Sequence, residues 1–258
     1  MARPALSASR TVAVLNFLAE RSPDEFSLSE IAQQLGINLA SSHALLTVLG
    51  DAGYVNRNPR LKTYTLGSVL VALGNAAERR HPAIQHAHEQ ARELSEDLEL
   101  AVTVTALAGE DIVFLERVGE HRPRDIGVQV GQRIAMVPPV GAVFAAWHDP
   151  EAWLARASDR PAMESVLADV RTRGWAVALG DPGSTEYQAL GPIDTRHAYD
   201  AAMIAAPVFG RNAEARVSLT LLGMEPGLSA KALVALGERV RDAALVATRR
   251  SGGRTPTG

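Results

Sequence analysis

The chain has 258 residues, of which 47% are hydrophobic, so it is long enough to fold into one large or two ordinary domains with buried cores. It has no cysteine, which excludes disulfides, thiol catalysis and cysteine-based zinc sites. Its net charge of −3 argues against indiscriminate coating of nucleic acid; with no apolar run near ~18 residues and no signal pattern, we expect a cytoplasmic protein without membrane contact.

The N-terminal quarter of the chain has the pattern of a winged helix-turn-helix. Ser27 and Glu30 form a capping box at the start of a helix over residues 27–35, which Gly36 ends. A second helix follows over residues 38–49, with Leu45, Leu46 and Leu49 toward the core. An amphipathic helix over 7–21 precedes this pair, and a hairpin with strands at 54–55 and 63–65 follows it. This order predicts a DNA reader whose second helix enters the major groove while the cations of the hairpin contact phosphate.

A helix–glycine–helix pair alone is common in proteins that bind no DNA, so the hairpin decides the interpretation. Its Arg57, Arg60 and Lys62 are phosphate contacts in a wing but only solvated residues in a plain turn. Asn38 either contacts a base or merely caps the second helix, and Ser41 is the favoured contact to base or phosphate. The predicted DNA-binding residues are Arg10, Asn38, Ser41, His43, Thr47, Arg57, Arg60 and Lys62. Residues 1–66 hold six Lys/Arg against five Asp/Glu, so binding depends on local placement of cations and on dimerisation.

Residues 67–80 predict a linker helix that ends before Pro82. Its apolar residues repeat at helical spacing: Val69, Leu70, Leu73, Ala76 and Ala77. Such a stripe is too long for a simple tether. We expect it to pair with its twin in a homodimer or tetramer.

The rest of the chain predicts an antiparallel sheet flanked by helices. Strands are expected at 102–107, 112–118, 125–130, 175–179, 203–209 and 216–222, with a polar loop over 180–199. Helices are expected at 81–100, from the alanine-rich stretch after 143 through Trp153, at 162–173, and after the capping residue Ser229. The fold class is therefore α+β. Its expected parts are a DNA-binding domain at 1–66, a linker helix at 67–81, an effector-binding and oligomerisation domain at 82–250, and a disordered tail at 251–258.

Several short motifs follow one another in an informative order. They are Gly53-Tyr54-Val55, Tyr64-Thr65-Leu66-Gly67, the segment 128–137 with Gly131, Arg173-Gly174-Trp175 and Ala205-Ala206-Pro207-Val208-Phe209. In their order and spacing, over nearly its whole length, the chain resembles the IclR family of transcriptional regulators. The resemblance implies an N-terminal winged helix-turn-helix, a linker helix and a C-terminal GAF-like effector domain. It also implies dimers, often paired into tetramers, on palindromic operators.

Two departures from the family pattern bear on specificity. The recognition helix of the family usually opens with a Ser-Thr pair and places an Arg before the Leu-Leu pair, where this chain has Ala40, Ser41 and Ala44. Losing the Arg removes a guanine contact worth ~1–3 kcal/mol of discrimination, so we expect a different operator sequence. The usual His/Ala/Ser run and Lys position of the family are Val137-Pro138-Pro139 and Val143 here, which predicts a drier and stiffer pocket rim.

The effector site is expected around the loop at 139–142, which leads into a helix. The first amides of that helix, at Gly141 and Ala142, can hold a carboxylate; the alternative is that the loop only starts the helix. Ser218 and Thr220 share one strand face, as ligand partners or as ordinary sheet residues. The predicted effector-binding residues are Ile126, Val128, Met136, Val140, Gly141, Ala142, Met203, Ala205, Ser218, Thr220 and Leu222. Their apolar character predicts a mostly apolar or aromatic acid as effector.

These features together predict a ligand-responsive DNA-binding regulator, a repressor, with operator DNA and a small-molecule effector as partners. We expect no enzyme, because the chain has no phosphate loop, no nucleotide-binding glycine fingerprint and no supported catalytic triad. We expect no cofactor and no metal, because His86 and His88 are two residues apart and face different sides of a helix. The alternative is a ligand-independent architectural DNA-binding or assembly protein.

Overall fold

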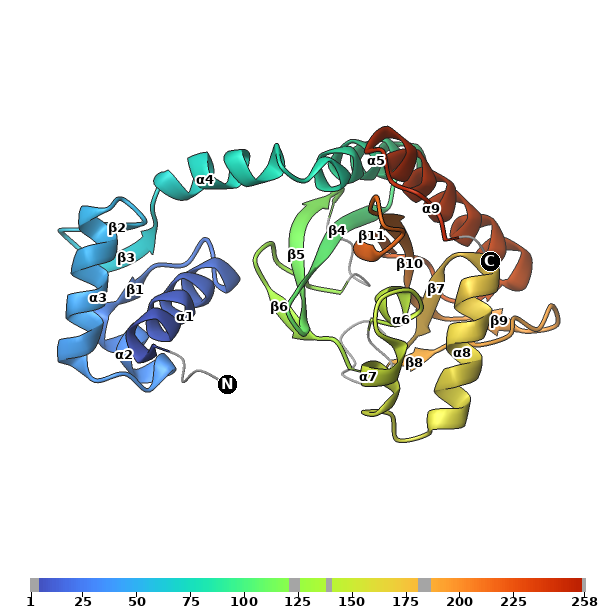
Figure 1. The fold of residues 1–258 in the computed structure, drawn as a ribbon, viewed down its shortest axis with the longest axis horizontal. Coiled ribbons are helices and arrows are strands. Elements are labelled where there is room, and N and C mark those ends of the chain that lie inside the picture. Colours follow the sequence, from blue (N-terminus) through green and yellow to red (C-terminus); the bar gives the residue numbers. More distant parts are fainter. Residues whose placement is uncertain (1–4, 121–125, 138–140, 181–186, 257–258) are drawn as a thin grey trace. The chain divides into compact units, whose positions relative to one another are not determined.

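The computed structural model describes residues 5–120, 126–137, 141–180 and 187–256. The chain divides into two compact units (Figure 1). The first comprises Met1–Arg80 with Gln129–Gln132, and the second comprises His81–Val128 with Arg133–Gly258. Each unit has its own hydrophobic core, so each is described by itself.

The first unit is a winged helix-turn-helix, as predicted. Its helices are α1 (Leu6–Glu20), α2 (Leu28–Leu35), α3 (Leu39–Asp51) and α4 (Val69–Glu78), and its strands are β1 (Phe26–Ser27), β2 (Val55–Asn58) and β3 (Thr63–Leu66). The capping box is present: the Ser27 hydroxyl accepts from the Glu30 amide, and the Ser27 amide donates to the Glu30 carboxylate. These bonds hold the pKa of the Glu30 carboxyl below its usual range. Strand β1 is an addition to the sequence prediction, and it pairs with β3 to give the order β1-β3-β2.

The hairpin is anchored to the end of α3 by a close backbone approach. The Gly67 amide donates to the Tyr54 carbonyl at 2.8 Å. A Cβ at position 67 would lie 2.1 Å from the carbonyl oxygen of Gly53, so only glycine fits there. This contact gives a physical reason for the two motifs that open and close the hairpin.

The second unit is built on an antiparallel sheet of seven strands within the described residues, in the order β6-β5-β4-β11-β10-β7-β8. The strands are β4 (Ala101–Ala108), β5 (Asp111–Val118), β6 (Arg133–Ala135), β7 (Ala176–Leu179), β8 (Gln188–Ala189), β10 (Ala201–Phe209) and β11 (Ala215–Leu222). A separate short pair joins β9 (Ala198–Tyr199) to β12 (Leu228–Ser229). The predicted fold class, α+β with an antiparallel sheet flanked by helices, is confirmed.

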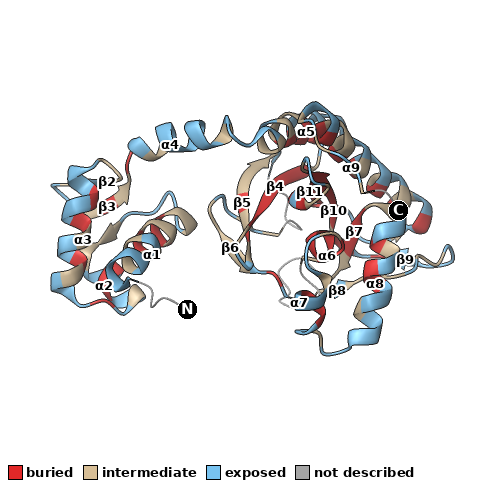
Figure 2. Cartoon of the chain, in the orientation of Figure 1, coloured by how far each residue is buried: buried red, intermediate tan, exposed pale blue. Residues whose placement is uncertain are grey.

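Two groups of helices cover the two faces of this sheet (Figure 1). Helices α5 (Pro82–Leu98) and α9 (Ala230–Arg250) share one core with Val104, Ile204 and Leu219. Helices α6 (Ala142–Ala145), α7 (Pro150–Leu154) and α8 (Arg160–Arg173) share the other core, which includes Ala205. Figure 2 shows that the central strands β4, β10 and β11 are largely buried.

Three local predictions are wrong. Within 125–130, the described residues 126–130 form no strand, because the Val128 amide donates to the nearby Ile126 carbonyl instead of to a ladder partner. The helix expected through Trp153 is split into α6 and α7, because the Asp149 side chain caps a new helix that starts with Pro150. The polar loop over 180–199 contains the short strands β8 and β9.

The tail after α9 also differs from the prediction of disorder, at least over residues 251–254. The Gly253 amide donates to the Thr248 carbonyl at 2.8 Å, and the Arg254 amide donates to the Gly210 carbonyl at 3.0 Å. A Cβ at position 253 would lie 2.0 Å from the Phe209 carbonyl oxygen. The glycine that made the tail look flexible is therefore the residue that lets it pack on the β10–β11 hairpin.

Candidate DNA interface and effector face

Helix α3 holds four of the predicted DNA contacts at its N-terminal cap and on its outer surface. The Asn38 side chain accepts from the Ser41 amide at 2.8 Å, which is the capping role weighed against base contact. Ser41 is half-buried, whereas His43 and Thr47 are exposed. The Thr47 hydroxyl donates to the His43 carbonyl at 2.9 Å. The inner side of the helix is formed by Ser42, Leu46 and Leu49, which are buried, and the predicted core residue Leu45 is only half-buried.

The wing places its three cations in solvent. Arg57 lies at the end of β2, and Arg60 and Lys62 lie in the turn; all three are exposed. Asn58 shapes this turn, because its side chain accepts from the amides of Arg60 and Leu61 at 3.1 and 3.2 Å. Sequence analysis placed the turn of the hairpin here but gave Asn58 no role of its own, although asparagine is a usual residue in such a turn. Arg10 is half-buried on α1.

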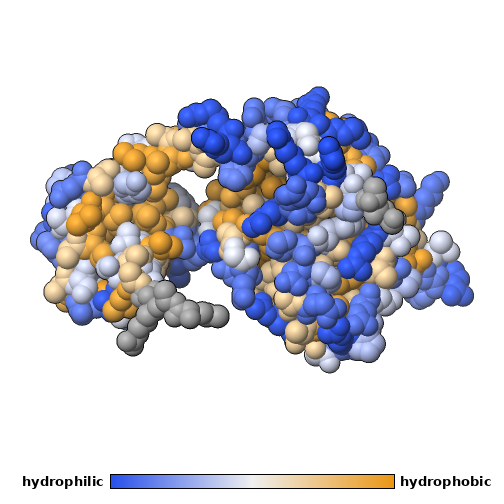
Figure 3. All heavy atoms as spheres, viewed as in Figure 1, coloured by the Kyte–Doolittle hydropathy of each residue, from blue (hydrophilic) through white to orange (hydrophobic). Residues whose placement is uncertain are grey.

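Helix α4 has an unusually exposed apolar surface. No residue of α4 is buried, and the structure describes all ten of them. Val69, Val71 and Leu73 are 37%, 64% and 46% exposed. In Figure 3 hydrophobic residues run along this helix. Val71 lies off the predicted stripe, so apolar side chains extend beyond one side of α4.

The late strands of the second unit bring five predicted effector residues onto one face. Met203 pairs with Leu222, and Ala205 pairs with Thr220; Ser218 follows two residues before Thr220. Side chains alternate along a strand, and the intervening Ile204, Leu219 and Leu221 lie in the core shared with α5 and α9. The five residues Met203, Ala205, Ser218, Thr220 and Leu222 therefore share the face that α6 and α8 cover.

Strand β4 adds two hydroxyls to this face that sequence analysis missed. Thr103 pairs with Thr220, and Thr105 pairs with Ser218. The Thr105 and Ser218 hydroxyls are hydrogen-bonded at 2.8 Å. The hydroxyl of Thr103 is fully buried and has no hydrogen-bond partner among the described residues. Thr103, Thr105, Ser218 and Thr220 form what we call the hydroxyl cluster, and all four are at most 7% exposed.

The register of β5 places a cation in the same row as this cluster. Arg117 pairs with Thr103, and Phe114 pairs with Thr105. The adjacent Glu116 bonds to Arg92 of α5 at 2.6 Å, so alternation puts Arg117 on the opposite face, with the hydroxyl cluster. Alternation along one strand gave no signal for the whole row, because β4 and β11 become neighbours only through the strand order of the sheet.

The remaining predicted effector residues are divided between the core and the loops. Met136 and Ala142 are buried in the core shared with Ala205. Gly141 has φ +84°, and a Cβ there would lie 2.4 Å from Met136 Cγ. Helix α6 has only four residues, which leaves little dipole for the predicted carboxylate at its N-terminus. Ile126 and Val128 are half-buried in irregular backbone, and Val140, like Pro138 and Pro139, lies outside the described residues.

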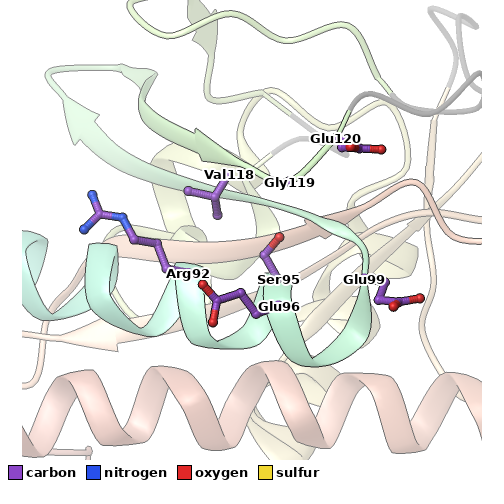
Figure 4. A pocket seen from close by; sticks show the side chains of 7 residues that line it. All are labelled: Arg92, Ser95, Glu96, Glu99, Val118, Gly119 and Glu120. Atoms are coloured by element: carbon purple, nitrogen blue, oxygen red, sulfur yellow. The ribbon is translucent and has the colours of Figure 1, made fainter.

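A cavity of about 600 Å³ lies elsewhere, on the α5 side of the sheet (Figure 4). Its lining residues are Arg92, Ser95, Glu96, Glu99, Val118, Gly119 and Glu120. The Ser95 hydroxyl donates to the Leu100 carbonyl at 2.8 Å. Three carboxylates against one guanidinium make this cavity a poor match for an acidic effector.

Two histidines of α5 lie beside carboxylates. His86 Nδ1 lies 2.9 Å from the Glu89 carboxylate, and His88 Nδ1 lies 3.7 Å from that of Glu116. The described residues contain no group of three or more His, Asp or Glu side chains placed to hold a metal ion. In the same part of the chain, no helix has the length and apolar character needed to cross a membrane.

Known proteins resemble this chain in sequence and in fold. Residues 7–59 match the IclR helix-turn-helix domain. The chain is 29% identical over 230 residues to the glycerol operon regulatory protein of Streptomyces griseus, covering 81% of this chain and 87% of that protein. Its fold is that of an IclR transcriptional regulator from Alicyclobacillus acidocaldarius, with TM-score 0.77, 21% identity and 97% and 100% of the two chains covered. An IclR homolog from Microbacterium hydrocarbonoxydans in complex with 4-hydroxybenzoate has TM-score 0.70 and 18% identity, with 95% and 98% covered.

Proposed function

Because the chain belongs to the IclR family of transcriptional regulators, we propose that it is a repressor whose affinity for operator DNA is set by a small organic acid. The matched proteins are transcriptional regulators, and this chain is a DNA-binding regulator and not an enzyme. Its proposed target is chromosomal DNA, so its place of action is the cytoplasm.

The hydroxyl cluster is the observation that supports the proposed binding of a small organic acid. A buried hydroxyl without a partner costs free energy, and Thr103 has that environment among the described residues. A ligand oxygen beside Thr103 and Thr220 removes this cost. The same face carries Phe114, Met203 and Leu222, which suit an apolar body.

The proposed effector is an aromatic or mostly apolar acid with its polar end on the hydroxyl cluster. The four hydroxyls make this wall more polar than the apolar rim suggests, so one end of the ligand is polar and the rest is not. Arg117, in the same row, has the charge to attract a carboxylate. The complex of an IclR homolog with 4-hydroxybenzoate supports this class of ligand.

Thermal shift and calorimetry with two sets of acids test the effector. We expect 4-hydroxybenzoate and related aromatic acids to raise the melting temperature and change operator affinity, and glyoxylate and pyruvate to have little effect. Thr220→Val should weaken the aromatic acids by about tenfold, the loss of one ligand hydrogen bond of about 1.4 kcal/mol. The matched control is Thr172→Val, at an exposed hydroxyl on α8, which should change nothing.

The same experiment separates the competing functions. Tight binding of glyoxylate or pyruvate without any aromatic response contradicts the proposed ligand class. A protein that binds its operator with unchanged affinity in every acid tested is the ligand-independent architectural protein instead.

For DNA, we propose that α3 enters the major groove and that the wing cations bind phosphate. Changing Arg57 and Arg60 together to Ala should weaken binding to every duplex and flatten its salt dependence. The log–log slope should fall by about 0.9 for each phosphate that the variant no longer neutralises. The control is Arg211→Ala with Arg216→Ala, two exposed cations of the second unit. Unchanged affinity and slope in the wing variant would show that the wing does not touch phosphate.

We propose that α4 links two copies of the chain, as the linker helix at 67–81. The exposed apolar side chains of this helix are the support for it, since their burial against a twin removes apolar area from water. Light scattering should give a dimer or tetramer at micromolar concentration. Leu70→Asp with Leu73→Asp should yield a monomer with lower operator affinity, and a monomeric unmodified protein would contradict the proposal.

A further inference from the structure

The outward face of α3 carries no cation and is built mainly from methyl groups. Ala40, Ala44 and Thr47 stand at helical spacing along the middle of the exposed face, and Val48 lies beside them. Val48 is 67% exposed, more than any other large hydrophobic side chain among the described residues. The sequence has no Lys or Arg from Ser22 to Asn56. The nearest cations after α3 are those of the wing.

Two polar side chains of this helix and its cap are hydrogen-bonded locally, and a third is buried. The Thr47 hydroxyl donates to the His43 carbonyl at 2.9 Å, and the Asn38 side chain accepts from the Ser41 amide. Ser42 is fully buried. The groups that α3 exposes are therefore mainly the methyl groups of the two alanines, Thr47 and Val48, with His43 on one flank and Leu39 at the N-terminal end.

The chemistry of the major groove assigns a partner to such a face. Guanine is read by Arg or Lys, and adenine by the amide of Asn or Gln, whereas the C5-methyl group of thymine is read by apolar contact. Between its cap and Asp51, α3 exposes none of those four residue types. The cations sit on the wing instead, where they suit phosphate, which carries no sequence information.

We propose that α3 selects its operator by contacts of Ala44 and Val48 with thymine methyl groups. This inference rests on the proposed function, in which α3 enters the major groove. It makes the operator half-site rich in A·T pairs and explains how the helix discriminates without a guanine-reading arginine. Ala44 and Val48 are then the residues that determine specificity.

The test begins with selection of duplexes by the full-length protein from a random pool. The selected half-site is then synthesised with each thymine replaced by deoxyuridine, which removes the methyl group and leaves every hydrogen bond of the base pair. We expect each contacted position to lose about fourfold in affinity, the effect of one buried methyl group. Uncontacted thymines should show no loss.

Variants of α3 show which residue contacts each thymine methyl group. Val48→Ala should abolish the deoxyuridine penalty at one position while leaving the penalties at the other positions. The matched control is Val12→Ala on α1, because Val12 is also an exposed valine, at 56%; it should leave every penalty unchanged. Ala44→Arg should move the preference at its position from thymine to guanine. Circular dichroism checks that each variant is folded.

The outcomes distinguish a failure of methyl reading from a failure of sequence-specific DNA binding. A selected half-site without thymine, or equal affinity for the thymine and deoxyuridine duplexes, overturns methyl reading and leaves sequence-specific binding in place. Penalties that persist unchanged in Val48→Ala and Ala44→Arg overturn the two named residues. Failure to select any sequence overturns the proposed function and this inference with it.

Discussion

Strands β4 and β11 contribute side chains to both faces of the central sheet, and the two faces have opposite chemistry. Toward α5 and α9, β4 and β11 present aliphatic side chains such as Val104 and Leu219. Toward α6 and α8 they present the hydroxyl cluster. Both faces are buried, so burial does not separate them. What separates them is their composition: the first face is aliphatic, whereas the second carries four hydroxyls, and that of Thr103 has no hydrogen-bond partner among the described residues. We propose that the first face stabilises the unit and that the second holds the ligand.

The largest effect is expected from opening a cavity on the aliphatic face. Leu219 is 0% exposed, and Leu219→Ala should lower the free energy of unfolding by about 2–5 kcal/mol. Denaturant unfolding followed by tryptophan fluorescence measures this, because Trp147, Trp153 and Trp175 all lie in the second unit. Val12→Ala, at an exposed site of the first unit, should leave this transition unchanged. A loss below about 1 kcal/mol would contradict close packing on this face.

A smaller loss is expected from adding one carbon to the same side. Gly237 of α9 packs against Trp175, and a Cβ there would lie 2.2 Å from the indole ring. Gly237→Ala should therefore destabilise the protein by about 1–3 kcal/mol, although alanine favours helices.

Gly74→Ala is the matched control for that change. It lies inside α4, where a Cβ would meet nothing within 4 Å, and it should gain up to about 1 kcal/mol. Melting temperatures that shift in the same direction for both variants would show that helix propensity, and not the contact with Trp175, decides the outcome.

Patterns local in the sequence were sufficient to predict most helices and strands. They were insufficient to predict which side chains gather on the hydroxyl face of the sheet. The Ser27–Glu30 capping box and the Ser229 cap were predictable because capping joins residues three positions apart. The meeting of Thr103 with Thr220 was not, because β4 and β11 lie far apart in the sequence and pair only through the strand order of the sheet. Arg117 faces Thr103 within the local β4–β5 hairpin, and sequence analysis did not identify it. The strand predicted at 125–130 was wrong over the described residues 126–130, because apolar alternation there has no ladder partner, whereas the nearby β6 pairs with β5.

On the hydroxyl face, breaking one internal hydrogen bond should cost about 1 kcal/mol. Thr105→Val removes the partner of the Ser218 hydroxyl, which is 1% exposed, and leaves it unsatisfied. The double variant Thr105→Val with Ser218→Ala should recover most of the lost free energy of unfolding, because neither hydroxyl is then left without its partner. A double-mutant cycle by denaturant unfolding measures the coupling. Strictly additive losses would mean that the two hydroxyls do not depend on each other.

The smallest effect on stability is expected at Thr103, and it is the sharpest test of the difference between the faces. The Thr103 hydroxyl is buried without a partner among the described residues, so Thr103→Val removes a cost and keeps the shape of the side chain. Without effector, the free energy of unfolding should stay the same or rise by up to about 1 kcal/mol. With a saturating aromatic acid, the variant should gain less than the unmodified protein, because ligand stabilisation falls as affinity falls. If Thr103→Val instead loses more than about 1 kcal/mol without any acid present, the hydroxyl has a partner inside the protein. The two faces would then both serve stability, and the ligand would have to be held elsewhere.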